Sequence, residues 1–154
     1  MGTQQLMILV VVIIVAGAAI VVGYTMFQQQ NYINNRSALS QDMQIFLTQV
    51  QKSYMLLVTF GGLSRDLEGI DAVQMANNIG WNGANPMTNA SGQYLIEIET
   101  DQMAIEIRGI GNEAHRGNRS AAHGRISFPS GEITVKHGTI SKVSAVADVD
   151  LLGE

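Results

Sequence analysis

A long uninterrupted apolar segment near the start of the chain limits what this sequence can fold into. From Leu6 to Val22 every residue is apolar or glycine, and the first charged residue is Arg36. A helix rises about 1.5 Å per residue, so about 20 such residues cross the ~30 Å core of a bilayer. The segment is apolar on all sides, which predicts complete burial in lipid or protein. The rest of a 154-residue chain is too small to enclose it.

The residues that flank this segment argue against two ordinary explanations. A secretory signal has a basic region before a shorter apolar stretch, but Gln4 and Gln5 occupy that place here. A plain membrane anchor carries positive charge on its cytoplasmic side, whereas Arg36 lies on the other side of the segment. Both observations are explained if a short basic leader is removed before Met1, and we expect such processing.

The start of the chain resembles mature type IV pilins. Those proteins begin with phenylalanine or methionine, usually carry glutamate at the fifth position, and continue with an apolar run. This chain begins with Met1 and continues with Leu6-Met7-Ile8 and further valines and isoleucines. Tyr24 stands where many pilins carry tyrosine, and Phe27 follows soon after. The resemblance is close over the first 27 residues and extends in architecture over the first 60.

The resemblance implies a homo-oligomeric helical filament, built from subunits that wait in the inner membrane until a pilus assembly machinery incorporates them. It also implies N-methylation of the processed start and a filament core made of bundled N-terminal helices. Small residues favour such a bundle because they let helices approach closely. The residues expected to carry assembly are Met1, Gln4, Gln5, Leu6, Met7, Gly17, Ala18, Tyr24 and Phe27.

Gln5 departs from the family pattern. The family's glutamate is thought to meet the N-terminal amine of a neighbouring subunit, and a glutamine cannot form that ion pair. A neutral amide has a smaller desolvation cost and is satisfied by hydrogen bonds alone, and Gln4 could share this role. Alternatively, both amides lie in the lipid headgroup layer. If a leader ended at Gly2, the mature chain would begin at Thr3 and Gln5 would lose its assigned place.

Residues 28–60 predict that the helix continues as an amphipathic element. Their apolar residues recur at steps of three and four, which indicates one buried stripe, and Gly61-Gly62 predicts the end of the helix. We therefore expect residues 28–60 to pack on a head domain and residues 1–27 to project from it. Whether the helix loosens between Gly17 and Gly23 stays open. The expected stripe comprises Leu39, Met43, Phe46, Leu47, Val50, Tyr54, Leu57 and Val58.

The rest of the chain predicts a small head. Residues 61–92 are rich in turn-forming residues and read as a connection, with a short helix expected over residues 66–78. Residues 93–154 predict an antiparallel meander of four or five strands, because apolar and polar residues alternate over 94–99 and 103–108. The predicted fold class is α+β, with a long N-terminal helix packed by its second half on an antiparallel β-meander.

Local signals predict where these strands end. Thr100-Asp101, Pro129–Gly131 and His137-Gly138 are expected to form hairpin turns. Residues 109–124 contain many glycines and polar residues and predict a long exposed loop. Residues 139–149 are expected to form a last strand close to the end of the chain.

Candidate chemistry is sparse in this sequence. The absence of cysteine excludes disulfides, thiolate metal sites and cysteine nucleophiles. His115, His123 and His137 do not have the spacing of a metal site, and we expect them to be solvated. No Ser-His-Asp set or paired carboxylates stand in a recognisable motif. We therefore expect no enzymatic activity, no metal and no cofactor.

The sequence contains three further groups of candidate residues. Asp148, Asp150 and Glu154 could give oxygen ligands to calcium, although they lack the ligand series of an EF-hand. A net charge of −4 argues against a general nucleic-acid binder, so the arginines in and beside residues 109–124 are expected to be solvated. N-x-Ser sequons, which are candidate glycosylation sites, begin at Asn35, Asn89 and Asn118.

Two functions follow from these observations. The first is a structural subunit of an extracellular type IV pilus-like filament, with heads exposed for attachment or motility. The alternative is a membrane-anchored binding module, and a secretion pseudopilin lies between the two. A filament subunit should tolerate few polar changes in residues 1–27, whereas a simple anchor should tolerate any apolar replacement there.

Overall fold

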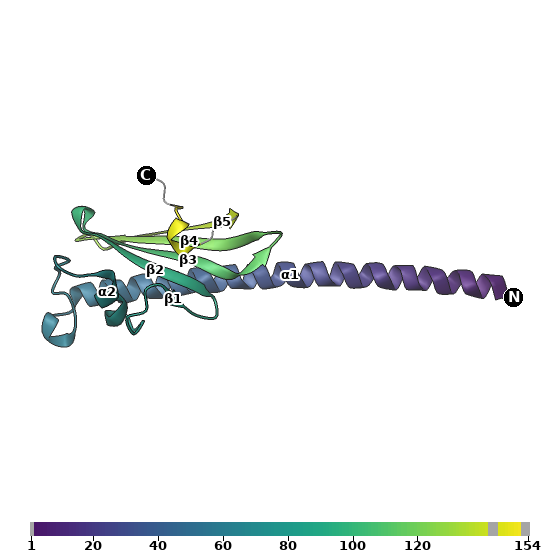
Figure 1. Cartoon of the computed structure of the whole chain (residues 1–154), viewed down its shortest axis with the longest axis horizontal. Helices are drawn as coiled ribbons and strands as arrows, with labels where there is room; N and C mark the ends of the chain where they lie inside the picture. The colour runs from purple at the N-terminus through teal and green to yellow at the C-terminus, as the bar shows by residue number, and fades with distance from the viewer. Residues whose placement is uncertain (1, 142–144, 152–154) are drawn as a thin grey trace.

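The structure is a computed structural model that describes residues 2–141 and 145–151. It is a long rod with a head on one half, and the predicted α+β class is confirmed (Figure 1). Within these residues, short 3-10 helices lie at Val58–Phe60, Thr100–Gln102 and Val146–Asp148. The main elements are α1 (Gly2–Met55), α2 (Ala72–Asn78), β1 (Met87–Thr88), β2 (Gly92–Glu99), β3 (Ala104–His115), β4 (Asn118–Ser127) and β5 (Glu132–Ser141).

The sheet is an antiparallel meander in the order β1-β2-β3-β4-β5, so each strand pairs with the next one along the chain. Ile96 on β2 lies opposite Ile107 on β3, which in turn lies opposite Gly124 on β4. These positions face α1, as the alternation in the sequence predicts. The turns expected at Thr100-Asp101 and at Pro129–Gly131 are confirmed, since each connects two successive strands.

The core forms where the second half of α1 lies against β3 and β4. The predicted stripe is confirmed for the residues nearest the sheet, while Phe46 is partly buried against them. Leu57 is exposed, contrary to the prediction, because the chain leaves the helix before reaching it. The fully or nearly buried apolar residues of α1 are Leu39, Met43, Leu47, Val50 and Tyr54.

α1 ends at Met55 rather than at residue 60, and the reason is a returning segment of chain. The N–H groups of Leu63 and Arg65 donate to the carbonyl oxygens of Ser53 and Tyr54, at 3.0 and 2.9 Å. These bonds satisfy carbonyl groups that would otherwise lack partners at a helix end. The predicted Gly-Gly stop therefore lies beyond the end of the helix.

The short helix expected over residues 66–78 is α2, which begins only at Ala72. Asp71 is its N-cap, and the Asp71 carboxylate accepts a hydrogen bond of 2.6 Å from the Gln74 N–H. Gly69, at φ +80°, lies in the turn-rich segment before this cap. The helix is therefore six residues shorter than the longest expectation.

The exposed loop predicted for residues 109–124 is wrong, since this segment continues β3 and β4 into a long hairpin. Arg116 and Gly117 form its two-residue turn, with φ of +53° and +79°, the pattern of a type I′ turn. The glycines that suggested a loop instead allow close packing. A Cβ on Gly124 would lie 2.6 Å from Leu47 Cδ1 and 2.9 Å from Met43 Sδ.

Two predictions near the C-terminus are also wrong. His137-Gly138 lies inside β5 and is not a turn. The strand expected over residues 139–149 stops at Ser141, and the chain forms the 3-10 helix Val146–Asp148 on the outer face of the sheet, opposite α1 (Figure 1). Leu151 of this segment packs over Gly138, where a Cβ would lie only 2.7 Å from Leu151 Cδ2.

Candidate functional site

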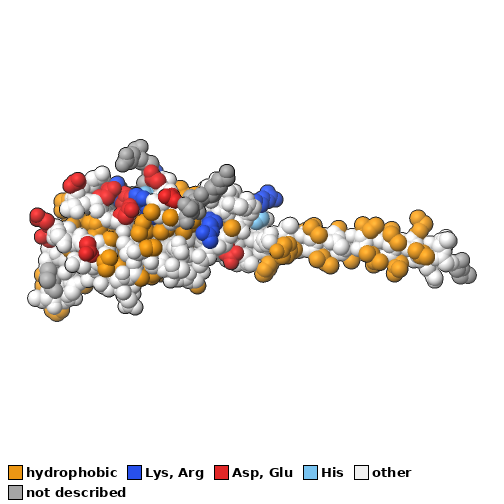
Figure 2. All heavy atoms as spheres, viewed as in Figure 1, with side chains coloured by type: hydrophobic (Ala, Val, Ile, Leu, Met, Phe, Trp, Pro, Cys, Tyr) orange, Lys and Arg blue, Asp and Glu red, His pale blue; other side chains and the backbone are white. Residues whose placement is uncertain are grey.

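The most conspicuous surface of the molecule is the apolar half of α1, defined here as residues 2–27. Every residue from 2 to 30 is exposed, and apolar side chains surround the helix on the part that projects from the head (Figure 2). Leu6 and Phe27, near its two ends, keep 64% and 63% of their surface exposed. Among the described residues, no other part of the chain covers this surface.

The helix is long and apolar enough to cross a membrane, judged by length and composition. α1 is continuous through Gly17 and Gly23, so the helix is not loosened there. A Cβ at either glycine would meet no atom within 4 Å. These positions therefore leave free space beside the backbone, which another helix could approach closely.

The residues expected to carry assembly lie on one exposed helix, and the head positions none of them. Their chemistry is limited to apolar packing and, through Gln4 and Gln5, amide hydrogen bonds. Met1 lies outside the described residues. The other members, all exposed, are Gln4, Gln5, Leu6, Met7, Gly17, Ala18, Tyr24 and Phe27.

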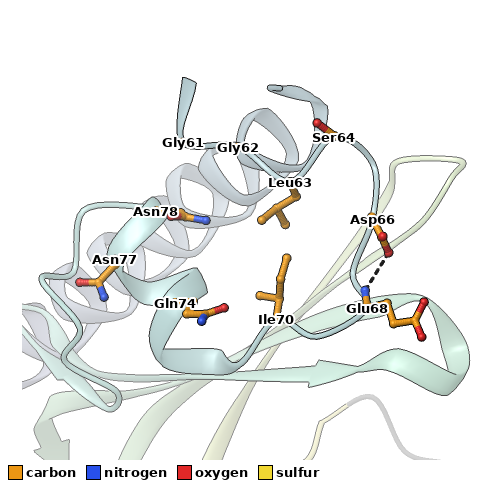
Figure 3. A pocket seen from close by; sticks show the side chains of 10 residues that line it. All are labelled: Gly61, Gly62, Leu63, Ser64, Asp66, Glu68, Ile70, Gln74, Asn77 and Asn78. Atoms are coloured by element: carbon orange, nitrogen blue, oxygen red, sulfur yellow. Dashed lines mark hydrogen bonds between the residues drawn. The ribbon is translucent and has the colours of Figure 1, made fainter. Parts of the chain in front are cut away.

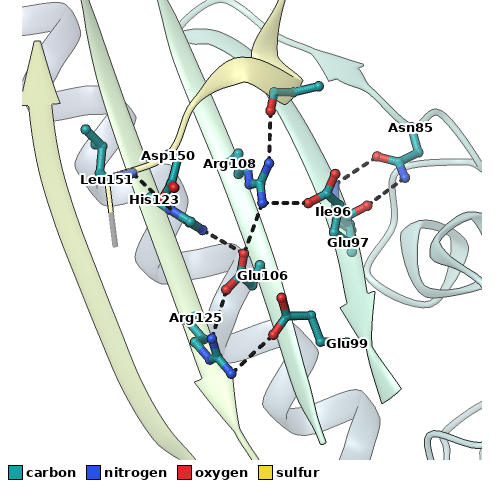
Figure 4. A network of polar contacts seen from close by, with 11 residues as sticks. Asn85, Ile96, Glu97, Glu99, Glu106, Arg108, His123, Arg125, Asp150 and Leu151 are labelled. Atoms are coloured by element: carbon teal, nitrogen blue, oxygen red, sulfur yellow. Dashed lines mark hydrogen bonds and ion pairs between the residues drawn. The ribbon is translucent and has the colours of Figure 1, made fainter. Parts of the chain in front are cut away.

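A second polar feature lies on the outer face of the sheet and is centred on Glu106 (Figure 4). This carboxylate is only 4% exposed. Its oxygens lie 2.9 Å from His123 Nε2, 3.4 Å from Arg108 Nη2 and 3.2 Å from Arg125 Nη1. Three donors therefore surround one buried carboxylate, which is the condition for burying such a charge without a large cost.

His123 joins this cluster to the C-terminal segment. The N–H of Leu151 donates to His123 Nδ1 at 3.3 Å, so the proton of the neutral ring is assigned to Nε2, which donates to Glu106. Asp150 Oδ1 lies 3.7 Å from the same Nδ1. Arg108 also donates to the carbonyl oxygen of Ala147 at 2.9 Å. The cluster thus holds the segment against the sheet.

The prediction that the histidines are solvated is wrong for His123, which is 2% exposed. His115 is half-buried with its ring 6.0 Å from that of Tyr32, and exposed His137 shares a 2.9 Å hydrogen bond with Ser40. No local signal marks His123, because its burial depends on a segment more than 20 residues away. Its cross-strand position opposite Arg108 only places it beside β3.

The arginines expected to be solvated divide into two pairs. Arg108 and Arg125 form ion pairs with Glu97 and Glu99 at 2.9 and 3.2 Å, in addition to their contacts with Glu106. Arg116 and Arg119 are exposed at the tip of the β3–β4 hairpin. The prediction of a solvated positive loop therefore holds only for the second pair.

Among the described residues, no group of three histidine, aspartate or glutamate side chains is arranged so that it could hold a metal ion. Asp148 accepts a 3.3 Å hydrogen bond from the Ala145 N–H, and Glu154 lies outside the described residues. Asp66 and Glu68 line one side of an open pocket beside α2 (Figure 3). Asp66 Oδ1 accepts the Glu68 N–H at 2.8 Å, so this oxygen already serves the local turn.

The three sequons differ in how accessible their asparagines are. Asn35 is 8% exposed, donates to the Ser91 carbonyl at 2.7 Å and accepts from Ser120 at 3.0 Å, so the folded head leaves no room for a glycan there. Asn89 is half-buried and donates to Asp42 at 2.9 Å. Asn118 is half-buried beside the hairpin turn.

Asp42 organises the polar contacts between α1 and β2. The hydroxyl of Tyr94, which is fully buried, donates to Asp42 Oδ2 at 2.8 Å. Burial, followed by the hydrogen bond and negative charge of Asp42, raises the pKa of Tyr94 far above its ordinary value, so the hydroxyl stays protonated. The Tyr94 ring also packs edge-on against Phe46 at 5.0 Å, which fixes the helix over the sheet.

Comparisons of this chain with protein families, with curated proteins and with solved structures gave no match. The functional argument therefore rests on the surfaces described above.

Proposed function

We propose that this protein is the structural subunit of an extracellular type IV pilus-like filament. The observation that carries the proposal is the apolar half of α1, an exposed apolar helix attached without a break to a folded head. Such a surface is stable only in lipid or against other apolar surface. Identical copies supply the second environment, and the first serves before assembly.

The free energy of burying apolar surface is large enough for a durable polymer. Burial of about 1,000 Å² of apolar surface is worth about 25 kcal/mol before the cost of ordering the subunits. The exposed Gly17 and Ala18 allow helices to approach closely, which increases the contact area. Gln4 and Gln5 can hydrogen-bond to neighbouring subunits in place of the ion pair that glutamate makes in the family.

One specific observation favours the alternative, a membrane-anchored binding module or a secretion pseudopilin. Gln5 lacks the charge that the resemblance assigns to assembly, while the helix meets the length and composition of a membrane span. The two functions differ in what the helix must do. An anchor needs only apolar side chains, whereas a bundle also needs side chains of the right size.

The test replaces Ala18 by a larger apolar residue. Ala18→Leu keeps the helix apolar and still inserts into membranes, but it fills the space where another helix approaches and is expected to cost about 1–3 kcal/mol per contact. We expect filaments sheared from producing cells to be lost or strongly reduced, with the subunit accumulating in membranes. Val12→Leu, which changes a residue that is already large, should leave filaments intact.

A more severe change tests the same point. Ala18→Arg places a charge in the bundle and should abolish filaments altogether. Normal filaments from this variant would refute the core bundle. Peptide masses of the sheared material supply a further check, because processing predicts a methylated start at Met1 or a start at Thr3.

A further inference from the structure

A second exposed apolar surface lies at the other end of α1. Met55, Leu56, Leu57 and Phe60 are consecutive or nearly so, and we call these four residues the distal patch. They keep between 48% and 76% of their surface exposed, with Phe60 the most exposed. Leu56 and Phe60 border a shallow groove between the last turn of α1 and the turn at residues 78–80. In Figure 2, orange side chains mark this end of the head.

We propose that the distal patch binds the apolar half of α1 from a second copy of this chain. The inference rests on the proposed filament and names one of the contacts that would build it. The two surfaces match chemically, because residues 2–27 contain no charged side chain and the distal patch contains none either. The groove beside the patch carries one charged side chain, Lys52, whose flexible stem can place its amine in solvent.

Geometry excludes the other occupants that the molecule itself suggests. The patch and the apolar half lie at opposite ends of a continuous helix, so they cannot meet within one chain (Figure 1). Residues 27 and 55 of that helix are about 40 Å apart, at 1.5 Å per residue. If residues 2–27 span a bilayer, the patch stands about 40 Å outside it and cannot enter the same membrane.

The contact is heterologous, because it joins two different surfaces of the same protein. A contact of this kind repeats without closing when the copies are related by a shift along the rod, and the product is an open filament. The position of the two surfaces on α1 requires a shift of between about 40 and 80 Å for the copies that touch. The head of one subunit then sits beside the apolar helix of a subunit further along.

The chain contains no cysteine, so single cysteines can report this contact directly. Phe60→Cys is combined with an epitope-tagged subunit that carries one cysteine, placed in turn at each position from 6 to 22. After assembly and mild oxidation, we expect disulfide-linked pairs between Phe60→Cys and positions on one face of the helix. No cross-link with any of these positions, or cross-linking of Phe60→Cys with itself, would overturn the proposal.

The same experiment separates this inference from the proposed function. Tagged subunits with a cysteine in residues 6–22 also cross-link with each other if the helices bundle. If residues 6–22 cross-link with each other but not with Phe60→Cys, the proposed filament is supported and the contact at the distal patch is refuted. Absence of both would count against the filament itself. A cross-link from Phe60 to an unrelated protein would assign the patch to a different partner and refute a contact between copies.

Substitution of Phe60 gives a quantitative check with a matched control. Phe60→Gln should raise the concentration of subunit needed for polymerisation, as detergent is removed, by about tenfold, which corresponds to about 1.4 kcal/mol. Phe60→Leu keeps the surface apolar and should change it by less than about twofold. Because Phe60 is largely exposed, neither change should lower the melting temperature of the head in detergent. Equal polymerisation by both variants would contradict the contact.

Discussion

The environment of Glu106 in the fold differs from the one that its position in the sequence predicts. In the sequence it alternates with apolar neighbours, as a solvent-facing residue does, whereas in the fold its carboxylate is 4% exposed. Its carboxylate meets Arg108, Arg125 and His123, and these partners are in turn fixed by it. Removal of the carboxylate leaves the buried His123 Nε2 without its acceptor, while Arg108 and Arg125 keep their ion pairs with Glu97 and Glu99.

We expect Glu106→Ala to lower the free energy of unfolding by about 1–3 kcal/mol, because it removes the shared acceptor of Arg108 and Arg125 and leaves the buried Nε2 of His123 without its partner. Unfolding in urea can be followed in detergent through the fluorescence of Trp81, which is the only tryptophan of the chain and is buried. Glu97→Ala is the control, since Glu97 is partly exposed and pairs only at the rim; it should cost less than about 1 kcal/mol. Equal losses of stability in the two variants would show that the contacts of Glu106 contribute no more than a partly exposed ion pair.

His137 predicts a weak pH dependence. Partial desolvation by the protein atoms around this exposed ring, followed by the positive charge of Arg36, lowers the pKa of His137 below its ordinary value of about 6.5. The unfolded chain therefore binds this proton at a higher pH than the folded head does. Stability should fall as the pH drops through about 6.5 and level off below the folded pKa. His137→Gln should flatten the part of the melting-temperature profile near pH 6; an unchanged profile would contradict this assignment.

At the level of elements, the packing of α1 on the sheet depends on missing side chains. Gly109 and Gly124 lie under Met43, and Gly124 also touches Leu47. A larger residue would force α1 away from β3 and β4, along most of their contact. These glycines belong to the segment that the sequence presents as a loop, although their role is to bring a helix close to a sheet.

Gly124→Val should therefore destabilise the head by about 1–3 kcal/mol through overpacking. The melting temperature of the head in detergent measures the effect. Gly23→Ala is the matched control, because a Cβ there meets no atom within 4 Å and the position is outside the head. A loss of head stability in the control, or none in Gly124→Val, would contradict the packing argument.

At the level of the whole molecule, the two halves of α1 have separate roles. The second half completes the core of the head, and the apolar half contributes nothing to that core. With such a helix the head is stably folded, but the free subunit exposes a large apolar surface to water, which is unfavourable. In the proposed function, assembly and membrane residence would depend on the same residues.

A variant that lacks residues 1–27 should consequently be a soluble, monomeric head. We expect its melting temperature to stay within a few degrees of that of the full chain in detergent, because every residue from 2 to 30 is exposed. Sedimentation and circular dichroism measure the two properties. An unfolded product would mean that the apolar half supports the head, and a polymer would mean that the heads alone assemble.

The sequence by itself determined the features that depend on local periodicity. The uninterrupted apolar run predicts a helix that is apolar on all sides, the steps of three and four predict the stripe from Leu39 to Tyr54, and alternation predicts β2 and the start of β3. Each of these signals is a property of consecutive residues and of the repeat of the element they form. They fix the α+β class and the candidate surface for assembly.

Only the tertiary structure decided which faces are covered. The C-terminal segment contacts His123 and Arg108 on the outer face of the sheet. The glycines of residues 109–124 lie inside β3 and β4, where Gly109 and Gly124 pack against α1. The end of α1 likewise depends on the returning segment that caps it. These outcomes arise from contacts between segments distant in sequence, and local residue patterns carry no information about such contacts.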